Sequence, residues 1–245
     1  MKRLIFATLL LLALVAAPVA SARTLVLSVG ISDYEGDQYD LERSGADAIK
    51  FADLMKQQNC NVTTITSKNA THDNVIAAIG KVCDAAKTGD RIMFFYSGHG
   101  AEGCIVSTEL QPVTYNEMMK LFLGSKAKDI VLFFDACFSG SIARDVKRTD
   151  KNIVFFLSSR PNEMSQEDRS WVKSGFLTQA LLKGLRGMAD TDKDKNVTVI
   201  ELFKYVYNDV VARIQKLNEV NGISVSQHPQ LVSTKSNYNM VLTSW

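Results

Sequence analysis

The sequence has little cysteine, little proline and almost no net charge. Four cysteines in 245 residues are too few for a disulfide scaffold, and four prolines leave no proline-rich linker. Lysine plus arginine number 28 against 26 aspartate plus glutamate, so a formal charge of +2 argues against nucleic acid as the main partner. The single long apolar run, at the N-terminus, excludes a protein with several membrane spans. Hydrophobic residues make up 46%, which is enough for a folded core.

Residues 1–22 have the three parts of a secretory signal peptide. A basic start precedes an apolar run over residues 4–17, and Ala20-Ser21-Ala22 forms an A-x-A cleavage site. The alternative, an uncleaved membrane anchor, is disfavoured because the run is short for a span. Cleavage would remove two positive charges and no negative ones, which leaves 26 charges of each sign. We therefore expect one domain over residues 23–245, secreted or periplasmic, with no stable membrane anchor.

Short apolar strands alternate with amphipathic helices along residues 23–245. This alternation predicts an α/β fold in which helices cover both faces of a mostly parallel central sheet. The strands are expected at residues 24–31, 62–66, 91–96, 130–134, 153–157 and 238–242. The helices are expected at residues 44–58, 71–86, 174–188 and 198–220, with a further one after the capping box of Thr114 and Glu117. In the first helix, the buried face is predicted to carry Ala46, Ile49, Ala52 and Met55.

Two of these strands end in residues that can carry chemistry. Tyr96-Ser97-Gly98-His99-Gly100 closes the third strand, and Asp135-Ala136-Cys137-Phe138-Ser139-Gly140 follows the fourth. Ligands bind beyond the carboxyl ends of parallel strands, so the two ends can face each other if the strands are neighbours. Taken singly, a cysteine after an apolar strand is usually a small core residue. Their joint occurrence predicts a thiol nucleophile with an imidazole base.

At these two motifs the sequence resembles the caspase-like cysteine peptidases, the clan of caspases, metacaspases and bacterial caspase homologues. The resemblance extends over essentially all of residues 23–245, and 38 residues separate the His and Cys motifs, against about 50 in caspases. It implies a caspase-like three-layer α-β-α sandwich, with Cys137 as nucleophile and His99 as general acid/base. The oxyanion would be held by the backbone N–H groups of Cys137 and Gly100, and the chemistry would require no cofactor.

The predicted specificity pocket departs from that of aspartate-specific caspases and resembles that of metacaspases, which cleave after Arg or Lys. Asp135 and Cys137 are alternate residues, so both can face the cleft. Asp47 and Ser97 match the same pocket, although Asp47 can equally be a first-turn residue favoured by the helix dipole. Two buried carboxylates need a cation, which a substrate Arg can supply. We expect a monomer that acts on protein or peptide substrates with basic residues.

A charged loop over residues 144–151 follows the nucleophile motif. Arg144, Lys147, Arg148 and Lys151 would suit self-processing by a basic-specific enzyme, as family members often process themselves at this place. The alternative is an ordinary solvated loop, which is the commoner meaning of such a run.

Residues 190–201 have the acidic spacing of an EF-hand calcium loop. The candidate Ca²⁺ ligands are Asp190, Asp192, Asp194, Asn196 and Glu201. Lys195 stands at the sixth position, where glycine normally takes the sharp turn. The alternative is a solvated acidic turn in which Thr198 and Glu201 cap the last helix.

The sequence leaves open two alternative functions and the disulfide state of two cysteines. The chain can be a catalytically silent caspase-like binding module, or a calcium-dependent structural domain that depends on the 190–201 loop alone. Cys60 and Cys83 can form a bridge or remain packed free thiols.

Overall fold

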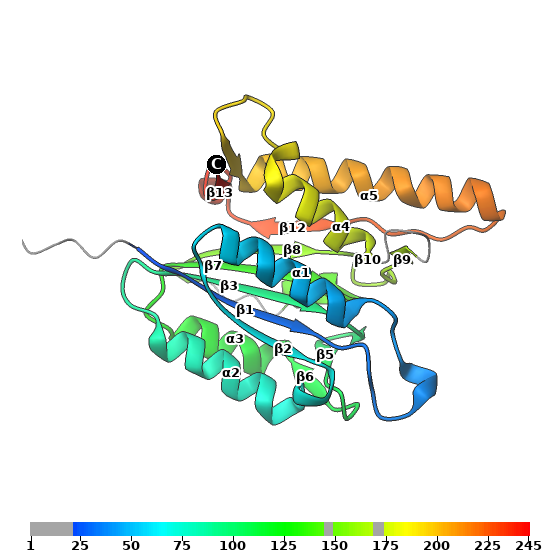
Figure 1. Ribbon diagram of the computed structural model, residues 1–245, viewed down its shortest axis with the longest axis horizontal. Coiled ribbons are helices and arrows are strands. Elements are labelled where there is room, and N and C mark those ends of the chain that lie inside the picture. The colour runs from blue at the N-terminus through cyan, green and yellow to red at the C-terminus, as the bar shows by residue number, and fades with distance from the viewer. Residues whose placement is uncertain (1–21, 145–148, 169–173) are drawn as a thin grey trace, which may run out of the picture.

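The computed structural model describes residues 22–144, 149–168 and 174–245, and it has three layers (Figure 1). The central sheet has the strand order β12-β8-β7-β3-β1-β2. Five strands run parallel, and β12 pairs with β8 in the antiparallel direction. The strand bounds are β1 Thr24–Gly30, β2 Asn61–Thr66, β3 Arg91–Ser97, β7 Asp129–Asp135, β8 Asn152–Leu157 and β12 Gln230–Ser233.

Helices cover both faces of this sheet, as the strand–helix alternation predicts. Figure 1 shows α2 (His72–Ala85) and α3 (Tyr115–Gly124) on one face, and α1 (Ser44–Gln57), α4 (Phe176–Lys183) and α5 (Val199–Asn221) on the other. Successive strand residues point to opposite faces, so Phe94 and Phe134 join the core under α2 and α3, whereas Phe95 and Phe133 join the core under α1, α4 and α5. This two-sided burial explains why the central strands are continuously apolar.

The buried face of α1 differs from the predicted one. Ala52 and Met55 are buried as predicted, but Ala46 and Ile49 are exposed, and Ala48 and Phe51 take their place on the buried face. Phe51 stacks on Phe95 of β3, with ring centroids 4.5 Å apart. The large aromatic ring sets the orientation, because burying it removes more apolar surface from water than burying Ile49 would.

Several short elements could not be predicted from the sequence, because a few residues are too few to show a periodic pattern. They are β4 (Gly100–Ala101), β5 (Cys104–Val106), β6 (Pro112–Thr114), β9 (Glu167–Asp168), β10 (Ser174–Gly175), β11 (Asn196–Thr198) and the helical turns η1 (Asp37–Tyr39), η2 (Ser67–Asn69), η3 (Ser139–Arg144) and η5 (Lys235–Asn237). The predicted helix 174–188 divides into α4 and a π-helical turn, η4 (Gly184–Met188). The closing strand, β13 (Val241–Ser244), pairs with β11 and starts three residues later than predicted.

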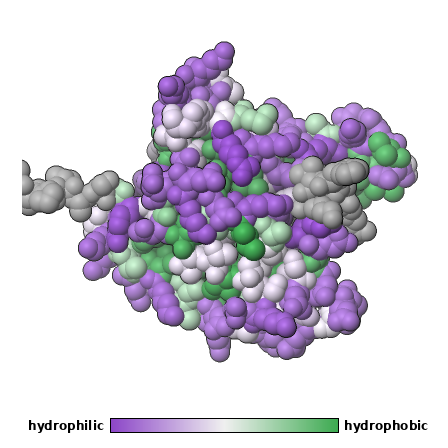
Figure 2. All heavy atoms as spheres, viewed as in Figure 1, coloured by the Kyte–Doolittle hydropathy of each residue, from purple (hydrophilic) through white to green (hydrophobic). Residues whose placement is uncertain are grey.

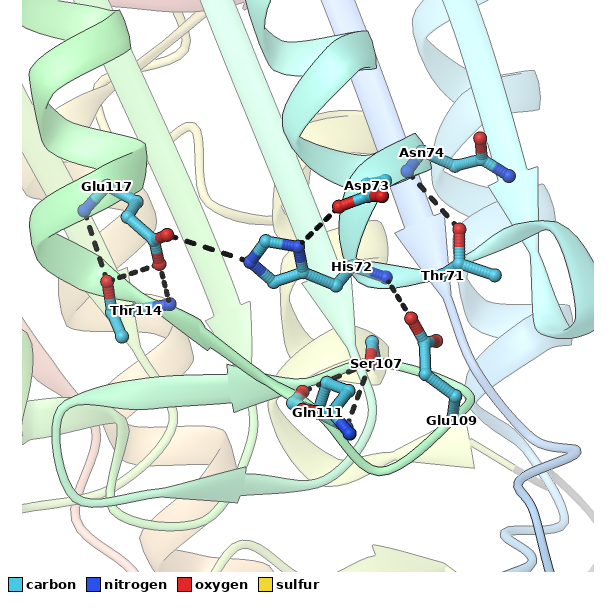
Figure 3. Close-up of polar contacts among 9 residues, drawn as sticks. All are labelled: Thr71, His72, Asp73, Asn74, Ser107, Glu109, Gln111, Thr114 and Glu117. Atoms are coloured by element: carbon cyan, nitrogen blue, oxygen red, sulfur yellow. Dashed lines mark hydrogen bonds and ion pairs between the residues drawn. The ribbon is translucent and has the colours of Figure 1, made fainter.

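A polar cluster joins the N-termini of α2 and α3 (Figure 3). Thr114 and Glu117 form the predicted capping box. The imidazole of His72 lies between two carboxylates, with Nδ1 2.9 Å from Asp73 Oδ1 and Nε2 3.6 Å from Glu117 Oε1. The backbone N–H of His72 donates to Glu109 at 2.7 Å. The cluster therefore ties the two helices and the β5–β6 connection together through one histidine.

Some sequence predictions concern residues that the structure does not describe. Residues 1–21 of the predicted signal peptide lie outside the described residues, as do Lys147 and Arg148 of the charged loop. At the end of that loop, Lys151 Nζ donates to the carbonyl oxygens of Ser125 and Ala127, at 2.6 and 2.8 Å. Within the described ranges, no helix combines the length and hydrophobicity needed to cross a membrane. All four cysteines are free thiols.

Candidate active site

The two motif-bearing strands are neighbours, so their carboxyl ends meet at one edge of the sheet. β3 and β7 pair in parallel, and Ser97 lies in register with Asp135. Two residues beyond each, His99 and Cys137 line the same cleft, which has a volume of about 840 Å³. Ser97, Asp135, Ser165, Glu167 and Gly175 line it as well. The structure therefore brings together the predicted nucleophile, the predicted base and two of the three predicted specificity residues.

The imidazole of His99 is held from several sides. Its Nε2 lies 2.7 Å from the carbonyl oxygen of Tyr39, and its ring packs against that of Tyr34 with centroids 4.7 Å apart. The backbone N–H of His99 donates to the Tyr34 hydroxyl at 2.7 Å, and the Tyr96 hydroxyl donates to the His99 carbonyl at 2.8 Å. A carbonyl can only accept, so Nε2 carries the proton in the neutral ring. Nδ1 is then the basic nitrogen.

Gly98 is required by the packing of these two tyrosines. A Cβ at this position would lie 2.5 Å from the Tyr96 hydroxyl and 2.7 Å from the Tyr34 hydroxyl. Burial raises the pKa of Tyr34 to about 12, so its hydroxyl stays neutral at physiological pH. The Gly-rich turn that carries His99 therefore packs against the buried hydroxyl groups of Tyr34 and Tyr96.

Cys137 lies between its own strand end and the loop that follows β8. The backbone N–H of Ser165 donates to Cys137 Sγ at 3.4 Å. Burial raises the pKa of the Cys137 thiol, and the negative charges of Asp135 and Glu167 raise it further. Burial and these two charges therefore favour the neutral thiol over the thiolate. Gly100 comes so close to the turn after β7 that a Cβ would lie 2.5 Å from the carbonyl oxygen of Cys137.

Asp135 is buried beside the thiol, but its oxygens have partners. Oδ2 accepts from the N–H and hydroxyl of Thr178, at 2.9 and 2.7 Å, and Oδ1 accepts from the hydroxyl of Ser165 at 2.7 Å. Burial nevertheless raises the pKa of this carboxyl. A Cβ on Gly175 would lie 2.1 Å from Oδ2, so only glycine leaves room for the carboxylate at the cleft wall.

Asp47 lies behind the cleft wall and is not among the residues that line the cleft. Its side chain has no solvent exposure. It accepts from the hydroxyl of Ser174 and, at 2.9 Å, from the N–H of Gly175, while Lys50 Nζ lies 3.6 Å away. Burial raises the pKa of Asp47 to about 7. Asp47 therefore holds β10, and β10 in turn forms the wall that faces Asp135.

Sequence reasoning missed Glu167, the second carboxylate of the cleft. The hydroxyl of Ser44, also a cleft residue, lies 3.4 Å from Glu167 Oε1. Burial raises the pKa of Glu167, and the charge of Asp135 adds to the effect. The rule about carboxyl ends of parallel strands could have found it, since Glu167 lies in the connection after β8, the neighbour of β7.

Gln227 and His228, in the segment before β12, form hydrogen bonds that hold the loop carrying Ser165 and Glu167 in place. Gln227 is buried, and its Oε1 accepts from the N–H of Gln166 at 2.8 Å. His228 Nδ1 lies 2.6 Å from Glu163 Oε1, and the carbonyl oxygen of Glu163 accepts from the N–H of Phe138 at 2.8 Å. Phe138 has a left-handed backbone, with φ of 58°. The segment around His228 thus supports the turn that presents Cys137.

The 190–201 loop brings three of its five predicted calcium ligands together. One carboxylate oxygen each from Asp190, Asp192 and Asp194 lie within 4.8 Å of one another. Lys195 adopts φ of 67°, the left-handed conformation for which an EF-hand uses glycine at that position. All five candidates already have protein partners. The three aspartates accept hydrogen bonds from backbone N–H groups of the loop. Glu201 accepts from Thr191 and Thr198, and the Asn196 side chain accepts from the Ser244 hydroxyl.

Comparison with known proteins relates the chain to peptidases. The family model of the caspase domain matches residues 23–239. A probable protease from a Desulfuromonadales bacterium is 25% identical over 71% of this chain and 26% of its own length. A vacuolar-processing enzyme from Glycine max is 30% identical over 41% of this chain and 23% of its own length. The chain thus spans about a quarter of the length of these curated relatives.

Two solved structures share the fold. Protein GSU0716 from Geobacter sulfurreducens matches with a TM-score of 0.63 and 19% identity, over 89% of this chain and 97% of that one. Caspase-1 from Spodoptera frugiperda matches with a TM-score of 0.64 and 14% identity, over 86% of each chain. At these identities the likeness concerns the fold, and it confirms the predicted caspase-like sandwich.

Proposed function

The chain belongs to the caspase-domain peptidase family, and from that premise we propose that it is a cysteine endopeptidase that cleaves proteins or peptides after Arg or Lys. One observation carries the proposal: Cys137, His99 and the carboxylates of Asp135 and Glu167 line a single cleft. A thiol and an imidazole supply the nucleophile and the base of acyl transfer, and the carboxylates supply a site for a cation.

In the proposed reaction, Cys137 Sγ attacks the carbonyl carbon of the scissile bond while the thiol proton passes to Nδ1 of His99. The tetrahedral intermediate collapses to a thioester, and His99 returns the proton to the leaving amine. Water then attacks the thioester with His99 as base, which releases the acid product and restores the thiol. The Tyr39 carbonyl supports this cycle, because it can hold Nε2–H while Nδ1 gains and loses the proton.

The electrostatics of the cleft support a basic substrate residue. Burial raises the pKa values of both Asp135 and Glu167, and the charge of Asp135 raises that of Glu167 further. A bound guanidinium would stabilise both carboxylates in the charged form. The same cation would offset the negative field that, in addition to burial, raises the pKa of the Cys137 thiol. Substrate binding and thiol activation would then be coupled.

Fluorogenic peptides test the proposal directly. Peptides that differ only in having Arg, Lys, Ala or Asp before the cut are compared on the full chain, with the Cys137→Ala variant as control. We expect turnover of the Arg and Lys peptides, loss of all turnover in Cys137→Ala, and covalent labelling of Cys137 by a thiol probe that weakens in His99→Ala. Faster hydrolysis of the Asp peptide would contradict the specificity. Labelling without any turnover would favour the silent binding module.

A further inference from the structure

Gln227 is a polar residue in the interior of the protein, close to the cleft but not among the residues that line it. Hydrophilic side chains dominate the surface in the view of Figure 2, whereas Gln227 is only 1% exposed. It lies in the segment between α5 and β12. A buried amide costs free energy unless its polar atoms are hydrogen-bonded, so its partners show what this residue holds in place.

Both polar atoms of the Gln227 amide bind the loop that follows β8. Oε1 accepts from the N–H of Gln166 at 2.8 Å. Nε2 donates to the carbonyl oxygen of Ser158 at 3.1 Å and to the hydroxyl of Ser165 at 3.3 Å. One side chain therefore connects the start of this loop to the residue that contacts the thiol.

Ser165 contacts Cys137 and Asp135 at the same time. Its backbone N–H donates to Cys137 Sγ at 3.4 Å, and its hydroxyl donates to Asp135 Oδ1 at 2.7 Å. Burial raises the pKa of the Cys137 thiol, whereas the hydrogen bond from Ser165 lowers it. When the thiol proton passes to His99 in the proposed reaction, negative charge develops on Sγ, and this charge strengthens the hydrogen bond.

The turn that carries Cys137 is bonded to the first part of the same loop. Three of its N–H groups donate there, which are Ala136 to Ser158 Oγ, Phe138 to the Glu163 carbonyl oxygen and Gly140 to the Ser159 carbonyl oxygen, at 3.0, 2.8 and 3.0 Å. The sulfur is therefore fixed relative to residues 158–163. Gln227 fixes residues 165 and 166 relative to Ser158, so the N–H of Ser165 meets the sulfur at a defined place.

We propose that Gln227 is a positioning residue, which holds the N–H of Ser165 in place to stabilise the Cys137 thiolate as it forms. The proposal rests on the proposed cysteine peptidase mechanism, to which it adds a donor to the sulfur and the residue that fixes this donor. An apolar side chain in place of the amide leaves the carbonyl oxygen of Ser158, a fully buried residue, without its donor. The loop must then shift to bind water or another group, and the Ser165 N–H shifts with it.

Alkylation of Cys137 by iodoacetamide tests the proposal without requiring turnover. Mass spectrometry of the full chain follows the peptide that contains Cys137, because the other three cysteines are free thiols as well. In Gln227→Met, we expect alkylation at pH 7 to slow about tenfold and its pH profile to move to higher pH, because the thiolate loses a hydrogen bond. The titratable groups that line the cleft with the thiol, His99, Asp135 and Glu167, are unchanged in this variant.

Asn237→Leu is the matched control, because it also removes a buried amide that contacts β8 and the end of β12. Asn237 is 4% exposed, and its Nδ2 donates to the Ile153 carbonyl oxygen at 3.4 Å and to the Ser233 hydroxyl at 3.1 Å. Ile153 lies at the start of β8, whereas Ser158 follows its last residue. Both variants should unfold at lower urea concentrations than wild type, but Asn237→Leu should keep the wild-type alkylation profile.

A measurement on the wild-type chain needs no variant. The amide proton resonance of Ser165 should move with pH along the same curve as the alkylation of Cys137, since this N–H contacts the titrating sulfur. A Ser165 resonance that does not follow this curve would overturn the proposal, as would unchanged alkylation in Gln227→Met or equal slowing in Asn237→Leu. These readouts decide the proposal even if no peptide is hydrolysed, so it can fail while the proposed peptidase activity stands, and the reverse.

Discussion

The Nε2 atom of His99 lies 2.7 Å from the carbonyl oxygen of Tyr39, and the Tyr34 ring packs against the same imidazole. The base of the proposed reaction is thus oriented by the loop after β1, through one backbone group and one side chain. A backbone carbonyl survives any side-chain substitution, whereas the Tyr34 hydroxyl does not. We therefore expect removal of the Tyr34 hydroxyl to impair catalysis and removal of the Tyr39 side chain to have little effect.

Tyr34→Phe is expected to lower kcat by about two- to tenfold with little change in KM. The substitution keeps the packed ring but leaves the His99 N–H without its acceptor, and one such hydrogen bond contributes roughly 0.5–1.5 kcal/mol. Steady-state kinetics on an Arg peptide measure kcat and KM separately. Tyr39→Ala is the control and should stay near wild type, because its carbonyl remains. Equal losses in both variants would contradict this role for the Tyr34 hydroxyl.

Asp135→Asn is expected to make the Cys137 thiol more reactive while weakening the recognition of Arg peptides. Removal of a negative charge beside Cys137 favours the thiolate, so the pKa of the thiol should fall and alkylation by iodoacetamide at pH 7 should accelerate. Loss of the same charge should raise KM for Arg peptides. The pH dependence of alkylation and the kinetics are measured on one preparation. A slower alkylation would show that the Asp135 charge does not oppose thiolate formation.

Glu167→Gln is expected to reduce kcat/KM for Arg peptides by about 10- to 100-fold while changing that for Ala peptides little. A charged hydrogen bond to a partly buried carboxylate contributes roughly 1.5–3 kcal/mol, and the amide cannot replace the charge. Glu42→Gln is the control, because Glu42 is exposed and pairs with Arg43 outside the cleft lining. Parallel losses for Arg and Ala peptides would assign Glu167 to structure rather than specificity.

The His72 cluster is expected to stabilise the fold only within a window of pH. Hydrogen bonding to Asp73 raises the pKa of His72 above its usual 6.5, so this stabilisation is complete below that pH and is lost as pH rises through the folded-state pKa. Hydrogen bonding to Thr114 lowers the pKa of Glu117 below its usual 4.5, so its stabilisation is lost as pH falls through that lower value.

His72→Gln should therefore unfold more easily than wild type at pH 5.5 by less than about 1 kcal/mol, since the pairs are partly exposed. At pH 9 the difference should vanish. Urea titrations at the two pH values measure it. An undiminished difference at pH 9 would attribute the effect to packing rather than charge.

We propose weak calcium binding by the loop of Asp190, Asp192 and Asp194. Three carboxylates at this spacing can ligate a hard cation, but Glu201 already accepts hydrogen bonds from Thr191 and Thr198 and would have to exchange them. A dissociation constant of roughly 10⁻⁵–10⁻³ M is therefore expected. Isothermal titration with Ca²⁺ against wild type and Asp190→Ala measures it. Identical heats in the two proteins would exclude binding at this loop.

Most of the fold follows from local patterns in the sequence. Continuous apolar strands such as β3 and β7 must be buried on both faces, and the Thr114–Glu117 box marks the start of a helix by its own chemistry. The short elements could not be predicted, because β9 and β10 have two residues each and are defined only by their pairing. The orientation of α1 could not be predicted either, since it depends on the fit of Phe51 against Phe95.

By itself, the sequence determined the fold class and the two motifs that carry His99 and Cys137, because strand periodicity and the chemistry of neighbouring residues are local properties. Secretion and self-processing remain predictions of the sequence alone. The tertiary structure decided which residues surround those motifs. It placed Asp47 behind the cleft wall, brought in Glu167 from the loop after β8, and laid the end of α5 along the same cleft. Those positions depend on strand order and side-chain packing between distant segments, which no local pattern records.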